Sequence, residues 1–223
     1  MSLLLFDLDG TILSGLGPYN ASLEQAIQET FSKDVKLGFT PTHGKTDRRI
    51  LKELLEKEDI SYSESNINIC LTRFGEIYQA NHNDINLVPG VISAIPSLSK
   101  GNTLGLVTGN VQQMARKKLR LFHINRENLN VYFPFGGFGH ESCNRADLVI
   151  KAIERGRDYG WNGIDASVIG DTPLDIQAAL EASDRLNRKI TPIGVTTGNY
   201  PREQLLQAGT EYVIDSLIDL FNI

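Results

Sequence analysis

The second half of the chain alternates short apolar segments with segments of helical periodicity, and this alternation limits the fold more than any other feature. Strands are expected at residues 103–107, 130–135, 167–170, 190–196 and 212–214, with a glycine-rich loop at 136–139. Helices are expected between and after them, at residues 111–122, 145–159, 178–182, 202–208 and 216–221. Because strands that alternate with helices form parallel sheets covered on both faces, the prediction is an α/β, Rossmann-like parallel sheet core.

The first 86 residues depart from this alternation. The run LLLF at residues 3–6 predicts one buried strand, whereas residues 18–86 contain three helical patterns and no strand signal. The second helix has Thr46 or Asp47 as its expected N-cap. We therefore predict an inserted α-helical cap domain at residues 15–86, and an α/β core domain formed by residues 1–14 and 87–223.

Composition and charge argue against several classes of function. The net charge of −5 leaves no basic stripe, so neither nucleic acid nor a membrane surface is an expected partner. No apolar segment approaches the roughly 18 residues that would cross a bilayer, and the N-terminal apolar run is too short for a signal peptide. Cys70 and Cys143 have no CxxC spacing, which argues against a disulfide or a cysteine zinc site. Together these features predict a cytoplasmic protein.

Polar side chains follow three of the predicted strands at the points where the strands end. In chain order they are Asp7 and Asp9, then Thr108, Gly109 and Asn110, and finally Asp171 and Asp175. Because ligands bind outside the carboxyl ends of strands in an open parallel sheet, we expect these residues at one edge of the sheet. Carboxylates that converge repel each other, and Mg²⁺ prefers carboxylate and water oxygens. The sequence therefore predicts a Mg²⁺ site at this edge.

The same residues form a pattern of known type. DLDGT at residues 7–11, a strand ending in Thr108, and GDTPLD at residues 170–175 occur in an order and spacing that resembles the haloacid dehalogenase superfamily of aspartate-nucleophile phosphohydrolases. The resemblance implies that Asp7 is the nucleophile and forms an aspartyl-phosphate. It also implies that Asp9 protonates the leaving oxygen and then activates water.

The resemblance further implies which residues hold the metal. Asp7, Asp171 and the main-chain oxygen of Asp9 are the expected Mg²⁺ ligands, and Asp175 is expected to orient metal-bound water. An acid at the position of Asp9 favours phosphoryl transfer over dehalogenation, because a departing halide needs no proton.

The remaining motif residues are expected to bind the phosphoryl group. Thr108, the backbone N–H of Gly109, and Asn110 are the expected cradle for its oxygens. The superfamily usually places a lysine about 25 residues before the GD motif, whereas this chain has Arg145, 26 residues before Asp171. A guanidinium keeps the positive charge but has a forked geometry. Lys151, 20 residues before Asp171, is the alternative.

The segment GKTD at residues 44–47 looks like the end of a P-loop, but the first glycine of that motif is missing at Phe39 and no strand precedes it. It resembles instead a turn and helix start in the cap of phosphoglycolate-phosphatase-like members. Lys45 is either a ligand for a substrate carboxylate or phosphate, or an exposed lysine at a capped helix start. The four histidines show no ligand spacing and are expected to be surface or core residues.

These inferences predict a Mg²⁺-dependent phosphatase that acts on a small phosphorylated metabolite, such as phosphoglycolate or a sugar phosphate. Three alternatives stay open at this point. They are a phosphomutase of the same superfamily, a signalling receiver-like protein that carries a phospho-aspartate, and a metal-binding scaffold without catalytic activity.

Overall fold

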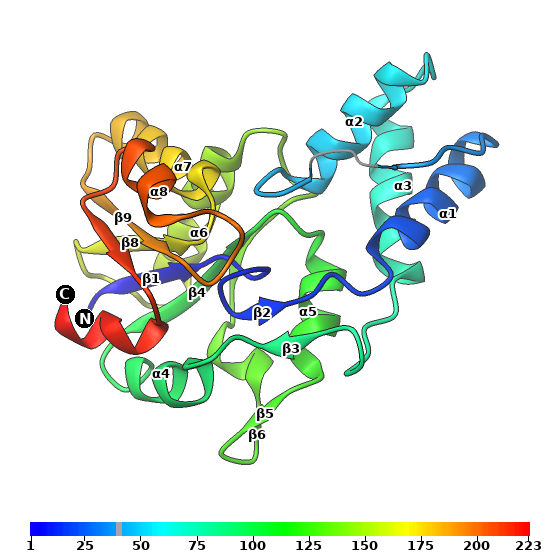
Figure 1. The fold of residues 1–223 in the computed structure, drawn as a ribbon. Helices are drawn as coiled ribbons and strands as arrows, with labels where there is room; N and C mark the ends of the chain where they lie inside the picture. Colours follow the sequence, from blue (N-terminus) through cyan, green and yellow to red (C-terminus); the bar gives the residue numbers. More distant parts are fainter. Residues whose placement is uncertain (39–41) are drawn as a thin grey trace.

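The structure is a computed structural model that describes residues 1–38 and 42–223, so Phe39 lies outside the described residues. Its centre is a six-stranded sheet with the strand order β10-β9-β8-β1-β4-β7, and every neighbouring pair is parallel (Figure 1). The predicted α/β, Rossmann-like fold is therefore confirmed. The strands are β1 (Leu3–Phe6), β4 (Thr103–Thr108), β7 (Gly136–Phe138), β8 (Ala166–Gly170), β9 (Ile190–Val195) and β10 (Tyr212–Ile214).

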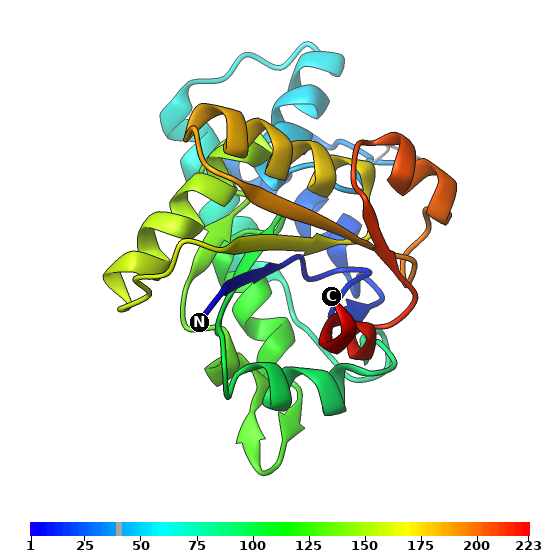
Figure 2. The same ribbon diagram turned by 90° about the vertical axis from the view of Figure 1, so that its left-hand side faces the viewer.

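Strand β1 shows how the sheet is covered on both faces. Alternate side chains of a strand point to opposite faces. Leu3 and Leu5 accordingly join one cluster of buried side chains, and Leu4 and Phe6 join another. Figure 2 shows the helices divided between the two sides of the sheet. One side has α6 (Arg145–Asp158), α7 (Pro173–Arg185) and α8 (Arg202–Gln207), and the other has α4 (Val91–Leu98), α5 (Gln112–Arg120) and the 3₁₀ helix η2 (Leu217–Asn222).

Three further helices lie on the side toward which β1 runs (Figure 1). They are α1 (Tyr19–Phe31), α2 (Asp47–Lys57) and α3 (Glu64–Ile77), and we call them the cap helices. The chain enters and leaves them through a short antiparallel ribbon of β2 (Leu13–Ser14) and β3 (Asn86–Leu87). Thr46 is the N-cap of α2, and its side chain accepts a hydrogen bond from the backbone of Arg49.

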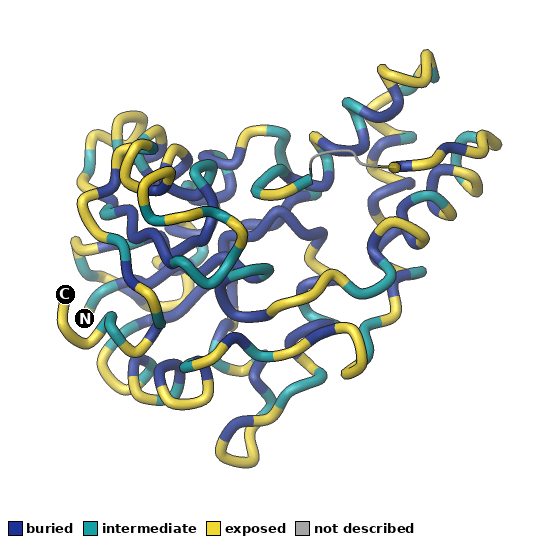
Figure 3. The backbone as a smooth tube through the Cα atoms, in the orientation of Figure 1, coloured by how far each residue is buried: buried dark blue, intermediate teal, exposed yellow. Residues whose placement is uncertain are grey.

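The buried sides of the cap helices belong to the same apolar cluster as α4 and α5. Figure 3 shows buried backbone through the sheet, and exposed backbone where α1 and α2 end far from it. Packing therefore continues from the sheet into the cap helices, and the division into a core and a cap domain at residues 15–86 stays a prediction. None of the helices among the described residues is long and apolar enough to cross a membrane.

The edge of the sheet differs from the prediction. The strand expected at 130–135 is replaced by a 3₁₀ helix, η1 (Leu129–Tyr132), and the glycine-rich segment expected to be a loop forms strand β7. A Cβ on Gly136 would lie 2.7 Å from the carbonyl oxygen of Leu106, and one on Gly137 would lie 2.0 Å from that of Leu148. Glycine therefore lets this strand fit between β4 and α6. A prediction from strand-forming residue types misses such a strand, because glycine is not one of them.

Three smaller elements were not predicted. They are helix α4, the ribbon of β5 (His123–Ile124) and β6 (Glu127–Asn128), and the ribbon of β2 and β3. The C-terminal segment, expected to be an α-helix, is the 3₁₀ helix η2.

Candidate active site

Three buried carboxylates meet at the carboxyl end of the sheet, and we call them the acidic cluster. Asp7 follows β1, Asp171 follows β8, and Asp175 lies in the first turn of α7, with one oxygen of each within 4.8 Å of the others. The register explains the first two, because β1 and β8 pair in parallel and the backbone N–H of Asp7 donates to the carbonyl of Ile169 at 2.8 Å. Neighbouring strands therefore end at the same level and place these two carboxylates side by side.

The residue that caps α7 is not Asp171, so the carboxylate of Asp171 does not accept the capping hydrogen bonds of this helix. Thr172 is the N-cap, and it forms a capping box with Asp175. Oδ2 of Asp175 accepts from the backbone N–H of Thr172 at 3.0 Å and from its hydroxyl at 2.7 Å. Oδ1 of Asp175 is buried without a hydrogen bond. The capping box thus holds Asp175 by one oxygen and leaves the other for the acidic cluster.

Arg145 is the cation of the acidic cluster. Its Nη2 donates to Oδ1 of Asp7 at 2.5 Å and lies 2.5 Å from Oδ1 of Asp175. Its Nη1 donates to the carbonyl of Gly44 at 3.0 Å, so one buried guanidinium contacts both the sheet edge and the segment before α2. Lys151 pairs instead with Glu141 at 3.4 Å and is 40% exposed. The structure therefore brings Arg145, and not Lys151, to the carboxylates.

Burial and mutual repulsion favour the protonated forms of Asp7 and Asp171. Burial raises the pKa of Asp7 well above its usual range, although the charge of Arg145 acts in the opposite direction. Burial, followed by the charge of Asp175, raises the pKa of Asp171 to about 7. The carboxylates of Asp175 and Asp7 in turn raise the pKa of Arg145, against the opposite effect of its burial. The acidic cluster is therefore costly to ionise when Arg145 is its only cation.

The acidic cluster fits a hard divalent cation. Three ionised carboxylates and one guanidinium leave two negative charges, which one divalent cation would balance. Oδ1 of Asp175 is buried and its one charged partner among the described residues is the guanidinium of Arg145, 2.5 Å away, so a carboxylate oxygen of the type that Mg²⁺ and its water ligands use faces the cluster. These residues therefore fit the predicted cofactor.

The loop after β9 completes the floor of this site and was not predicted to take part. A Cβ on Gly198 would lie 1.8 Å from Oδ2 of Asp171, so only glycine fits there. The hydroxyl of Thr197 donates to the carbonyl of Gly10 at 2.6 Å and ties this loop to the DLDGT turn. The hydroxyl of Thr11 in that turn donates to Oδ1 of Asp171 at 3.1 Å.

The carboxylate of Asp9 lies outside the acidic cluster; the predicted metal contact of Asp9 is through its main-chain oxygen and stays a prediction. Lys118 donates to both of its oxygens, at 2.8 and 2.7 Å, and Nδ2 of Asn110 donates to Oδ2 at 2.7 Å. These hydrogen bonds direct the carboxylate of Asp9 toward Lys118 and Asn110. Lys118 was not predicted to belong to the site. The sequence does place this lysine on the apolar side of an amphipathic helix, which indicates a buried charge that needs a partner.

The three residues predicted to bind the phosphoryl group do not all reach the cavity. Gly109 and Asn110 line a cavity of about 60 Å³ above the acidic cluster, whereas Thr108 is fully buried and does not line it. The hydroxyl oxygen of Thr108 accepts from the backbone N–H and Nδ2 of Asn110, at 3.2 and 3.0 Å. Thr108 therefore orients Asn110, and Asn110 in turn contacts Asp9.

The cap helices close the other side of this cavity. Lys45 lines it, but its Nζ pairs with Glu53 at 2.6 Å. His43, an exposed residue, also lines it. Two cavity residues that were not assigned to the site, Tyr19 and Asp47, are buried and joined by a hydrogen bond of 2.7 Å.

Asp47 also ties α2 to the loop after β4. Its Oδ2 accepts from the backbone N–H of Val111 at 2.6 Å, and its own N–H donates to the carbonyl of Gly109 at 2.8 Å. Burial raises the pKa of Asp47 to about 7, and burial together with Asp47 raises that of Tyr19. The structure thus describes a closed arrangement in which α2 rests on the loop that lines the cavity.

Comparisons with known proteins agree with this architecture. The family model of haloacid dehalogenase-like hydrolases matches residues 4–186. A hydrolase from Pseudomonas syringae is 22% identical with a TM-score of 0.66, and a predicted phosphatase from Clostridium acetobutylicum is 20% identical with a TM-score of 0.67. A predicted phosphoglycolate phosphatase from Haemophilus somnus 129pt is 20% identical with a TM-score of 0.65. Each alignment covers 99% of this chain and 96% of the other. No curated protein matches the chain.

Proposed function

The chain belongs to the haloacid dehalogenase-like hydrolases, and on this premise we propose that it is a Mg²⁺-dependent phosphatase of a small phosphorylated metabolite. The observation that carries the proposal is the acidic cluster with Arg145 at the carboxyl end of the sheet. Phosphoryl transfer needs mainly positioning and the neutralisation of phosphoryl charge, and this arrangement supports both.

In the first step, a carboxylate oxygen of Asp7 attacks phosphorus while the bond from phosphorus to the leaving oxygen breaks. Asp9 gives its proton to that oxygen, so the metabolite leaves as an alcohol. Arg145, which contacts Asp7 at 2.5 Å, offsets negative charge on the nucleophile and on the phosphoryl group. The product of this step is an aspartyl-phosphate on Asp7.

In the second step, Asp9 takes a proton from a water molecule that attacks the phosphorus of the aspartyl-phosphate. The bond from phosphorus to Asp7 breaks, inorganic phosphate forms, and the carboxylate of Asp7 is restored. Asp7, Asp171 and the main-chain oxygen of Asp9 would hold Mg²⁺, with Asp175 beside them. When bound, Mg²⁺ would neutralise phosphoryl oxygens and so ease attack by an anionic carboxylate.

The size and lining of the cavity support a small substrate. The cavity has a volume of about 60 Å³ and lies between the sheet edge and the cap helices. Lys45 and Arg145 are among its lining residues. Closure of the cap helices over a bound substrate would exclude water from the reacting groups. Phosphoglycolate and sugar phosphates lead the set of substrates to test, because a predicted phosphoglycolate phosphatase is among the similar structures.

The test is phosphate release with Mg²⁺ and with EDTA, from phosphoglycolate, sugar phosphates, nucleotides and p-nitrophenyl phosphate. We expect release that requires Mg²⁺ and is lost in Asp7→Asn but kept in Asp158→Asn, which makes the same change at an exposed position. Full activity in Asp7→Asn would refute the assigned nucleophile. Conversion of one sugar phosphate into its isomer without net phosphate release would instead identify a phosphomutase.

A further inference from the structure

Lys118 is a buried lysine that the reaction described above does not use. Its side chain is 0% exposed, and its Nζ contacts three oxygens: Oδ1 and Oδ2 of Asp9 at 2.8 and 2.7 Å, and Oδ1 of Asn110 at 2.9 Å. Its Nζ also lies 5.6 Å from the centroid of the ring of Tyr78. Burying an ammonium group is costly unless it is paired and hydrogen-bonded, and here all three of its donors have an acceptor.

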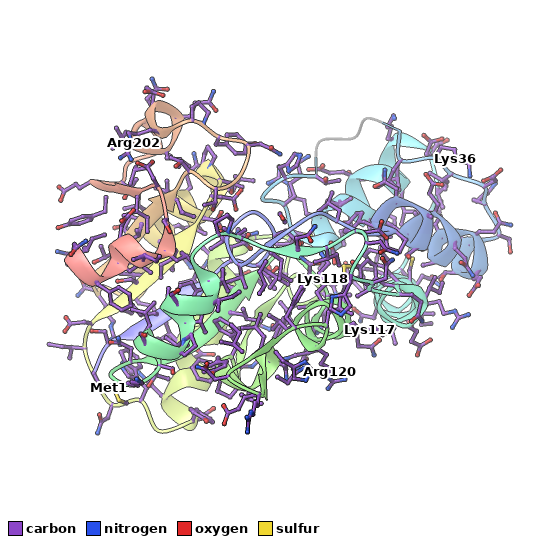
Figure 4. The ribbon with its side chains drawn as sticks, turned by 60° about the horizontal axis from the view of Figure 1, so that its bottom comes forward. Met1, Lys36, Lys117, Lys118, Arg120 and Arg202 are labelled. Carbon is purple, nitrogen blue, oxygen red and sulfur yellow. The ribbon has the colours of Figure 1, made fainter. Side chains whose placement is uncertain are left out.

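The neighbouring lysine on α5 shows what a purely structural contact looks like. Nζ of Lys117 donates to the carbonyls of Glu76 and Tyr78, both at 2.8 Å, where α3 ends. Figure 4 shows the two lysines on α5 beside the cap helices. Lys117 therefore stabilises the end of a helix, whereas the hydrogen bonds of Lys118 go only to Asp9 and to the residue that holds Asp9.

Lys118, Asn110 and Asp9 form a closed triangle of hydrogen bonds. Lys118 binds the side-chain oxygen of Asn110, and this leaves the amide nitrogen of Asn110 to donate to Asp9 at 2.7 Å. Thr108 holds the same amide nitrogen from the other side at 3.0 Å. Each side chain therefore has one orientation that satisfies its partners, and the carboxylate of Asp9 is held at the cavity wall, apart from the acidic cluster.

We propose that Lys118 is a positioning residue, which holds the carboxylate of Asp9 where it meets the leaving oxygen and keeps it from joining the acidic cluster. This inference rests on the proposed function, because it concerns the proton that Asp9 transfers. Without Lys118, the carboxylate of Asp9 loses two of its three hydrogen bonds. It is then free to turn toward the cation that Asp7 and Asp171 would hold.

The test compares two substrates in one variant. An alkyl phosphate needs its leaving oxygen protonated, whereas p-nitrophenyl phosphate does not, and general acid catalysis contributes roughly 10²- to 10⁴-fold. In Lys118→Met we expect kcat/KM to fall by about 100-fold for the alkyl phosphate and far less for p-nitrophenyl phosphate. Lys117→Met, one position away, should leave the ratio of the two values unchanged. Unfolded protein lowers both values equally, so the ratio does not depend on how well the variant folds.

A second variant shows whether Lys118 acts through Asp9. If it does, adding Lys118→Met to Asp9→Asn should cost little beyond Asp9→Asn alone, because the side chain that Lys118 positions is already altered. Equal losses on both substrates in Lys118→Met, or fully additive losses in the double variant, would overturn the proposal. Absence of phosphate release by the wild-type protein would refute the proposed function instead, so the two failures are distinguishable.

Discussion

Removal of Mg²⁺ should make the stability of this protein depend on pH through the acidic cluster. Asp171 faces Asp7 from β1, Asp175 from α7 and Arg145 from α6, and burial followed by the charge of Asp175 raises its pKa from 3.8 to about 7. Between these two pH values the folded chain binds a proton at Asp171 that the unfolded chain has released. The free energy of unfolding should therefore fall as the pH rises through this interval.

The size of the effect follows from the shift. A shift of about three pKa units corresponds to about 4 kcal/mol over the whole interval, since one unit is worth about 1.4 kcal/mol. Between about pH 5.5 and about pH 8, the loss from Asp171 alone should be about 2 kcal/mol. Asp7 adds to it in the same direction, because burial raises its pKa as well.

The assay is urea unfolding in EDTA and in saturating Mg²⁺ at both pH values. A cation that binds only the folded, ionised acidic cluster stabilises the protein by mass action, so the increment from Mg²⁺ should be larger at about pH 8 than at about pH 5.5. Asp171→Asn should lose most of this difference. Equal increments from Mg²⁺ at both pH values, or none at either, would refute the reasoning.

Three further predictions concern single residues. Arg145→Ala should lower kcat/KM by about 100-fold or more, whereas Lys151→Ala should change it by less than about two-fold, and steady-state phosphate release decides between them. Gly198→Ala should raise the Mg²⁺ concentration needed for half-maximal activity, because its Cβ would lie 1.8 Å from a carboxylate oxygen of the acidic cluster. Gly101→Ala, where a Cβ meets nothing within 4 Å, is the matched control. Burial raises the pKa of Asp47 to about 7, so its contribution to the free energy of unfolding falls as the pH rises toward 7. In saturating Mg²⁺, Asp47→Asn should therefore show a smaller fall of the free energy of unfolding with rising pH, measured by the same urea unfolding.

Much of the fold could be predicted because its signals are local. The apolar run of β1 and the alternation after residue 103 each lie within a few residues of sequence, and the predicted strands that became β1, β4, β8, β9 and β10 are confirmed. Strand β7 could not be found in this way. Its sequence is rich in glycine because β4 and α6 approach closely from two sides, and only the assembled sheet shows that approach.

The site likewise has a part that follows from local sequence and a part that depends on contacts between distant residues. Asp7 and Asp171 directly follow buried strands, and parallel strands end at a common edge, so sequence alone was sufficient to expect them together. The hydrogen bonds that orient the site join residues far apart in the chain: Lys118 and Asp9 are separated by 109 residues, and Val111 and Asp47 by 64.

The sequence by itself determined the class of sheet and the carboxylates at its edge, because both depend on the spacing of neighbouring residues. Only the tertiary structure decided that Lys118 holds Asp9, that Arg145 lies between Asp7 and Asp175, and that α2 rests on the loop after β4. The physical reason is that helical periodicity shows which side of a helix is buried, but not which distant carboxylate or carbonyl that side will meet.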